Sequence, residues 1–142
     1  MKIEELVLTV EQMNHLKELG LEFYETSLCW YLNFFSKKYD HVGINKRTKS
    51  DYLQEKRDNL SSPIPTLTLQ EILNLLPEEI NDGTMGKSIE INKIVYKSAY
   101  GSGGNDFTFK GKNLLEAAYE ALSWLTEYKY LNKKYKNESM CN

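Results

Sequence analysis

Two short segments of the chain carry the pattern that starts an amphipathic helix. At Thr9 the hydroxyl can accept from the backbone N–H of Gln12 while the Gln12 side chain reaches back, which makes a capping box. Apolar residues then recur at helical spacing until Gly20, which favours a left-handed helix end. The same pattern recurs at Thr68 and leads into a short leucine-rich run that Pro77 ends. We therefore predict helices that begin after Thr9 and Thr68.

A third and longer helix is predicted to begin at Asn113. Apolar side chains follow it at spacings of three and four, which line one face of a helix; they are Leu114, Leu115, Ala118, Tyr119, Leu122 and Leu125. Glutamates in its first half and lysines near its end complement the helix dipole. Residues 133–142 beyond it are expected to form a disordered tail.

The segment between the second and third helices has the alternation of β-strands. Residues 88–92 alternate apolar and polar, 94–100 are rich in β-formers, and 107–109 follow a glycine-rich loop. This pattern predicts a three-stranded antiparallel meander. A further strand is indicated at 27–35, but both faces of that run are apolar, so strand and helix both stay open there.

Residues 36–62 hold few apolar anchors among many charges, which predicts a long surface excursion with about one helical turn at 52–57. Taken together, the elements predict an α+β fold. A small antiparallel sheet of three or four strands would pack against about three helices, including a long C-terminal helix. At 142 residues, the chain has the usual length of one domain, so we predict a single domain over 1–142.

Charge and composition narrow the class of partner. A net charge of -2 disfavours a protein that holds nucleic acid non-specifically. No apolar run approaches the roughly 18 residues of a membrane span, and the N-terminus lacks the apolar core of a signal peptide. One cysteine lies in an apolar run and the other in the polar tail, which fits a reducing compartment. We expect a soluble cytoplasmic protein with no membrane partner.

The glycine-rich stretch at 101–104 is the first place to look for an anion site, because free backbone N–H groups in such loops can bind phosphate. The stretch leads into a strand at Phe107, whereas phosphate loops lead into a helix, so a plain hairpin loop is the favoured interpretation. If the loop does bind a ligand, the candidate contacts are Lys97, Tyr100, Gly103, Asn105 and Lys110.

Other residues with chemical potential have structural interpretations. His15 and His41 lack metal-ligand partners at useful spacing, and the apolar neighbours of Cys29 indicate core packing. Glu78 and Glu79 follow a proline, as in a first helical turn. We predict no metal, cofactor or catalytic residue, and no enzymatic activity.

Residues 66–77 and 113–125 together resemble a family of small proteins carried by phages, prophages and mobile elements of gut anaerobic bacteria. The likeness consists of the leucine-rich helix that ends at Pro77, a meander, and the Ala117-Ala118-Tyr119-Glu120 pattern of the last helix. That family has no assigned activity. The resemblance implies a bacterial or phage setting and no particular chemistry.

The leading hypothesis is therefore a non-enzymatic accessory protein of a phage or mobile element that binds a host macromolecule, most simply a protein. Its basis is the lack of catalytic motifs and an aromatic-rich composition. The alternative is a protein that binds or sequesters a small anionic ligand, such as a nucleotide, at the 101–105 loop. Homo-oligomerisation stays open.

Overall fold

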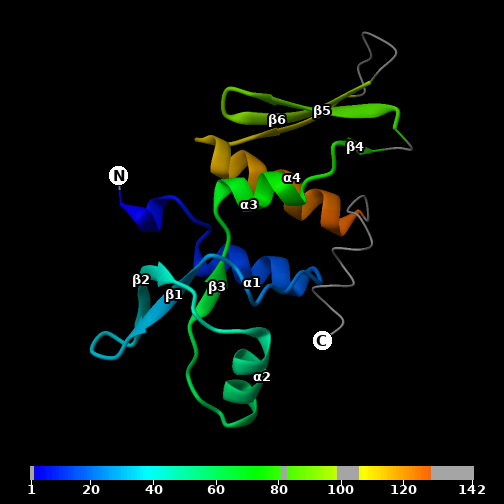
Figure 1. Cartoon of the computed structure of the whole chain (residues 1–142). Helices are drawn as coiled ribbons and strands as arrows, with labels where there is room; N and C mark the ends of the chain where they lie inside the picture. Colours follow the sequence, from blue (N-terminus) through cyan, green and yellow to red (C-terminus); the bar gives the residue numbers. More distant parts are fainter. Residues whose placement is uncertain (1, 81–82, 99–105, 129–142) are drawn as a thin grey trace. The chain divides into compact units, whose positions relative to one another are not determined.

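The computed structural model describes residues 2–80, 83–98 and 106–128, and within them the fold is α+β, as predicted (Figure 1). The elements in chain order are η1 (Ile3–Glu5), α1 (Val10–Glu18), β1 (Leu28–Asn33), β2 (Lys38–Ile44), α2 (Lys49–Arg57), β3 (Ile64–Thr66), α3 (Leu69–Leu75), β4 (Glu79–Ile80), β5 (Met85–Glu90), β6 (Lys93–Ser98), β7 (Phe107–Lys110) and α4 (Leu114–Glu127). The strands form two antiparallel sheets, where the sequence had indicated one.

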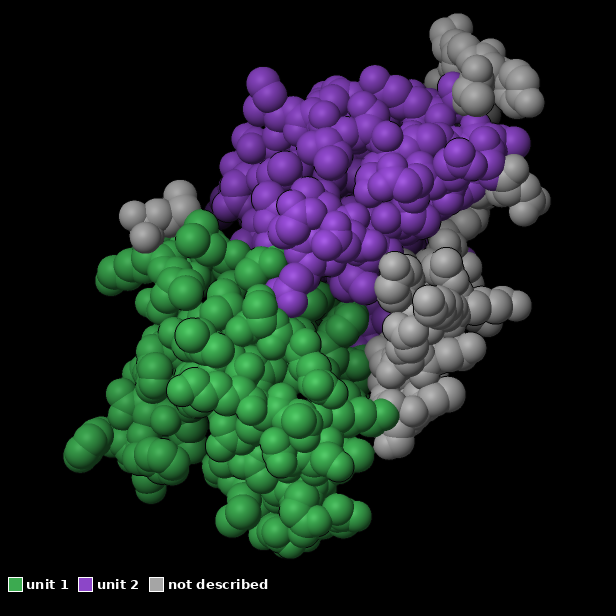
Figure 2. All heavy atoms as spheres, viewed as in Figure 1, with its two compact units in different colours: residues 1–18, 22–68 green, residues 19–21, 69–142 purple. Residues whose placement is uncertain are grey.

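These elements divide between two compact units (Figure 2). Unit 1 holds residues 1–18 and 22–68, and unit 2 holds residues 19–21 and 69–142. Each unit contains one sheet and its own helices. The assignment of the chain to a single domain stays a prediction, and the tail predicted at 133–142 lies outside the described residues.

The sheet of unit 1 has the order β2-β1-β3, so β1 is the central strand. This settles the open choice at 27–35 in favour of a strand. Both faces of the run are apolar because both are covered: Trp30 is buried on one face and Cys29 on the other. A central strand with two covered faces lacks the polar alternation that identifies a half-exposed one.

The N-terminal segment of unit 1 is tied to this sheet through the backbone of Leu8. Its carbonyl accepts from the Trp30 indole at 2.9 Å and from the buried Thr66 hydroxyl at 2.7 Å. Its N–H donates to the Leu67 carbonyl at 3.1 Å. Leu8 thereby satisfies its backbone groups while its own side chain is fully buried.

The predicted start of α1 is confirmed by two reciprocal hydrogen bonds. Thr9 Oγ1 accepts from the Gln12 N–H at 3.1 Å, and the Gln12 side chain accepts from the Thr9 N–H at 2.9 Å. After the helix, Gly20 adopts a φ of 99°, the left-handed conformation expected of it. The start of α4 at Asn113 is also confirmed, because its side chain accepts from the Glu116 N–H at 2.9 Å.

The prediction of a surface excursion over 36–62 was wrong. The segment contains strand β2 and all of α2, which is longer than the single turn expected. Helix α2 begins with a further capping box, in which Thr48 and Asp51 exchange hydrogen bonds of 2.9 and 3.2 Å. Its one buried residue, Tyr52, anchors the helix to unit 1.

The sheet of unit 2 has the order β4-β5-β6-β7, and β5, β6 and β7 are the predicted meander. Helix α4 contacts β6, β7 and α3. On β6, Ile94 and Tyr96 lie on one face of the sheet and are buried, while Val95 is buried on the opposite face and Lys97 is exposed. The fully buried residues of the predicted stripe on α4 are Ala118, Leu122 and Leu125.

The interpretation of Glu78 and Glu79 as a first helical turn was wrong, because Glu79 belongs to strand β4. The Lys87 N–H donates to the Glu78 carbonyl at 2.8 Å, which draws this segment into the β4–β5 ladder. The proline did mark a boundary, since α3 ends at Leu75, two residues before Pro77.

Among the described residues, no helix has both the length and the apolar character that crossing a bilayer requires.

Candidate functional site

The residues proposed from the sequence as anion contacts do not form a site in the described structure. Lys97 on β6 is exposed, and its ammonium lies 2.9 Å from a Glu90 carboxylate oxygen. Lys110 lies at the end of β7, paired in register with Lys93. The other three proposed contacts lie outside the described residues: Tyr100, Gly103 and Asn105.

The register also separates the two lysines. Lys97 is four residues along β6 from Lys93, the register partner of Lys110, which corresponds to roughly 13 Å along the sheet. One phosphate group cannot bridge that distance. The described part of unit 2 therefore gives no support to a nucleotide site built on Lys97 and Lys110.

Cys29 on β1 and His41 on β2 have surroundings that fit a structural role. The Cys29 Sγ is fully buried, 4.0 Å from the Ile44 carbonyl oxygen, and burial raises the pKa of its thiol. The His41 ring stacks on Tyr31 and its Nδ1 lies 3.0 Å from the Asp40 carboxylate. Over residues 2–80, 83–98 and 106–128, no group of three or more His, Cys, Asp or Glu side chains could hold a metal ion.

The described structure has a concave surface in unit 1, an open groove of about 390 Å³ along α2. We call it the α2 groove; its lining residues are Arg47, Asp51, Gln54, Glu55, Asp58 and Leu60. Four of them recur at 51, 54, 55 and 58, the spacing that places side chains on one face of a helix. Leu60 joins them because the chain folds back after the helix, where the Leu60 N–H donates to the Glu55 carbonyl at 2.9 Å.

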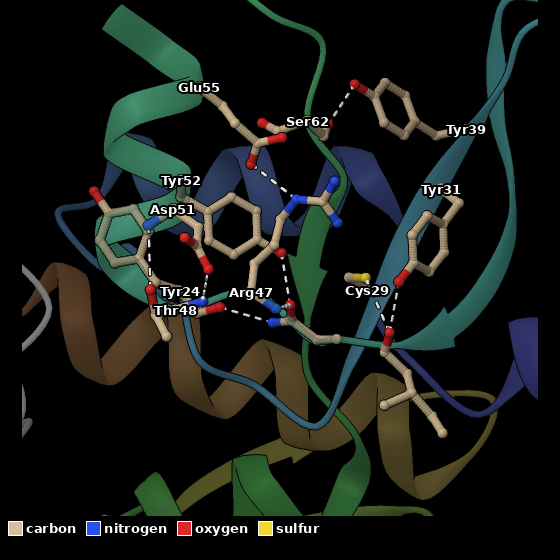
Figure 3. Close-up of polar contacts among 12 residues, drawn as sticks. Tyr24, Cys29, Tyr31, Tyr39, Arg47, Thr48, Asp51, Tyr52, Glu55 and Ser62 are labelled. Carbon is tan, nitrogen blue, oxygen red and sulfur yellow. Dashed lines mark hydrogen bonds and ion pairs between the residues drawn. The ribbon is translucent and has the colours of Figure 1, made fainter.

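Arg47 supplies the only basic side chain of the groove lining. Its Nε donates to the Glu55 carboxylate at 2.8 Å, and its Nη atoms make no hydrogen bond to any described residue. Figure 3 shows Arg47 extended between Tyr52 and Tyr31 with its Nε facing Glu55. Although partial burial lowers it, the contact with Glu55 raises the pKa of Arg47 overall. The guanidinium is therefore held in place with its outer donors unused.

Asn45 fixes the loop that carries Arg47. Its side-chain oxygen accepts from the Tyr52 hydroxyl at 2.8 Å and from the Arg47 N–H at 3.2 Å. Its side-chain nitrogen donates to the Tyr24 carbonyl at 2.7 Å. Burial raises the pKa of Tyr52 well above its ordinary value, so its hydroxyl stays protonated as a donor. The arginine wall of the groove is thus pre-organised by hydrogen bonds in unit 1.

The α2 groove is lined by three carboxylates and one cation. Glu55 is matched by Arg47. From the residues that the structure describes, Asp51 accepts only the Thr48 N–H of its capping box, and Asp58 accepts only the Gln54 amide. A group with positive charge is attracted to such a surface. The Arg47 Nη donors suit a carbonyl oxygen, and Leu60, which is 59% exposed, offers apolar contact. These three features match a basic peptide segment.

A second exposed feature of unit 1 is the turn between β1 and β2. Phe34 is 78% exposed and Phe35 is fully exposed, and Lys37 and Lys38 follow after Ser36. We call this the Phe34–Phe35 tip. Most large apolar side chains are at least partly covered in a folded protein, so two adjacent exposed phenylalanines are informative.

Sequence reasoning missed both features, although each has a signal in the sequence. The Thr48-x-x-Asp51 pattern is the same kind of helix start as the ones recognised at Thr9 and Thr68. Phe34 and Phe35 are neighbours, and neighbouring residues of a strand point to opposite faces, so both could not lie on one covered face. Followed by Ser36-Lys37-Lys38, the pair marks the end of a strand.

The fold and the α2 groove define an α+β protein with an open, acidic peptide-sized surface. Comparisons with protein-family models, with curated proteins and with solved structures found no significant match to this chain. The resemblance to phage and mobile-element proteins therefore stays a prediction from the sequence.

Proposed function

We propose that this chain is a non-enzymatic binding protein whose α2 groove receives a basic segment of a partner protein. The observation that carries the proposal is the groove itself, with two carboxylates that have no cationic partner among the described residues. Its membership of a phage or mobile element, with a host protein as the partner, rests on the sequence resemblance alone.

The proposed contacts follow from the groove's chemistry. Lysine or arginine side chains of the partner pair with Asp51 and Asp58, while the Arg47 Nη atoms donate to a partner backbone carbonyl. Leu60 packs against an apolar residue of the same segment. Exposed charge pairs contribute only about 0.2 to 1 kcal/mol each, so the expected affinity is modest and falls with added salt.

A fluorescently labelled peptide of alternating lysine and leucine serves as the probe. We expect it to bind the native chain and to bind the double variant Asp58→Asn, Leu60→Ala on the order of 10-fold more weakly. The matched control is Glu5→Gln, which removes one exposed carboxylate of unit 1 outside the groove. Equal binding by all three proteins would rule out the groove as the binding surface.

The same variants identify the natural partner. Bacterial lysate is passed over columns of the native chain, the groove variant and the Glu5→Gln control. A protein retained by the first and third columns and lost from the second is the expected result. If the native column retains nothing that the groove variant does not, the proposed function fails.

A further inference from the structure

The Phe34–Phe35 tip is built differently from the α2 groove, and its function does not depend on the groove. We propose that the tip inserts into the surface of a bilayer that contains anionic lipids. This proposal departs from the expectation of no membrane partner that the sequence suggested. Among the described residues no helix could span a bilayer. Insertion of a turn into the interface needs no such helix.

Both rings of the Phe34–Phe35 tip are exposed. Phe35 is fully exposed and Phe34 is 78% exposed, so neither side chain is needed to hold the fold of unit 1. The transfer of a phenylalanine side chain from water to an apolar medium is favourable in free energy. Aromatic side chains are favoured at the interfacial depth of a bilayer.

The backbone N–H groups of the turn form hydrogen bonds within the turn itself. Asn33 Oδ1 accepts from the N–H groups of Phe35 and Ser36, at 2.9 and 3.3 Å. The Lys37 N–H donates to the Asn33 carbonyl at 2.6 Å, and the Lys38 N–H donates to the Ser36 hydroxyl at 3.3 Å. Four successive N–H groups are thus paired within the turn. A backbone that enters an apolar medium must already have its hydrogen bonds, because lipid chains offer none.

The turn that carries the two rings is also held rigidly. The Asp40 carboxylate accepts from the Asn33 amide at 3.0 Å and from the Ser36 hydroxyl at 3.2 Å, which braces the turn from the opposite strand. Lys37 completes it with a φ of 60°. A braced turn loses little conformational entropy when it inserts.

The Phe34–Phe35 tip also carries positive charge. Lys37 and Lys38 have no carboxylate partner within the described residues, and in the sequence they follow the two phenylalanines after one residue, Ser36. Lysines at this position stay at the headgroup level, where anionic lipids attract them. The hairpin between β5 and β6 offers a contrast. Ile91 at its turn is 90% exposed, but the neighbouring Lys93 faces Glu90 at 3.7 Å.

A bilayer fits the tip better than a protein pocket. Protein interfaces bury about 800 Å² on each partner and surround their aromatic anchors with contacts that exclude water. The residues next to the phenylalanines in the turn, Ser36, Lys37 and Lys38, are polar and exposed. A lipid surface requires no complementary shape around the two rings.

The test is co-sedimentation of the full chain with vesicles of phosphatidylcholine, with or without phosphatidylglycerol. We expect stronger binding to the anionic vesicles. The double variant Phe34→Ala, Phe35→Ala should lower the partition coefficient on the order of 100-fold, and Lys37→Gln with Lys38→Gln should lower it on the order of 10-fold. Ile91→Ala is the matched control and should bind as the native chain does.

Thermal unfolding shows whether the variants fold, and we expect unchanged midpoints because the two rings are exposed. In Phe35→Trp, insertion should shift the indole emission to shorter wavelength and expose it to quenching by brominated lipids. Absence of binding to anionic vesicles overturns the proposal, and so does binding that survives loss of both phenylalanines. If Phe34 and Phe35 instead govern capture of a protein, the occupant is a protein pocket and the bilayer proposal is wrong.

Discussion

Lys87 on β5 offers the sharpest test of the energetics of unit 2. Its side chain is only 7% exposed, and its ammonium lies 3.2 Å from the Leu73 carbonyl oxygen and 3.4 Å from that of Leu76. The Leu73 carbonyl belongs to the last turn of α3, and Leu76 directly follows the helix, so neither carbonyl is followed by a further turn of helix that could supply an N–H group. The ammonium therefore caps the C-terminus of a short helix and complements its dipole.

Lys87→Met keeps the aliphatic length and removes the charge. Hydrogen bonds to a charged group contribute about 1.5 to 3 kcal/mol, and a cation at a helix C-terminus contributes about 0.3 to 1 kcal/mol. Because these contributions overlap, we expect a loss of about 1.5 to 3 kcal/mol in the free energy of unfolding of unit 2. With a urea m value of about 1 to 3 kcal/mol/M, the midpoint should fall by at least about 0.5 M.

The assay is urea unfolding followed by the fluorescence of Trp124 in a Trp30→Phe background, so that the signal comes from unit 2 alone. Glu78→Gln is the control. Glu78 lies 3.0 Å from the Lys87 ammonium but is 83% exposed, so its loss should cost less than about 0.5 kcal/mol. A Lys87→Met variant as stable as its parent, or a Glu78→Gln variant that is equally damaged, would refute the capping argument.

Four further outcomes are expected. Gly111→Ala should destabilise unit 2 by about 1 to 3 kcal/mol in urea unfolding, because an added Cβ would lie 2.7 Å from the backbone nitrogen of Ala117 in α4; an unchanged midpoint would contradict this. Asn113→Ala should cost about 1 kcal/mol through the lost helix cap, with Asn113→Asp close to native as its control. Burial raises the pKa of Tyr96, so stability should be full below about pH 10, where the unfolded tyrosine ionises, and should fall as the pH rises further. Tyr96→Phe, which also loses a 2.6 Å hydrogen bond to the Pro77 carbonyl, should be less stable at neutral pH but lose less of its stability on the alkaline side. If the chain is a single domain, the tryptophans of units 1 and 2 should report one coincident unfolding transition, and two separate midpoints would show two domains.

The sequence by itself determined the local features. A capping box needs only residues three positions apart, so Thr9 and Asn113 identify the starts of α1 and α4 without knowledge of their surroundings. The apolar stripe of α4 and the β-rich runs of the meander have the same local origin. Thr48 carried an equally local signal for α2, so the missed helix was an error of reading rather than a limit of the sequence.

Tertiary structure alone decided how these elements combine. The run at 27–35 forms a strand because β2 pairs with it on one side and β3, which is distant in sequence, pairs with it on the other. The α2 groove forms because a loop places Arg47 beside α2 and a chain reversal places Leu60 there. No periodic pattern in the sequence predicts either placement. Phe34 and Phe35 are exposed because strand β1 ends before them. Whether a side chain is exposed depends on how the rest of the chain folds around it. Long-range pairing and burial depend on the whole chain at once, whereas helix caps and stripes depend on a few neighbouring residues.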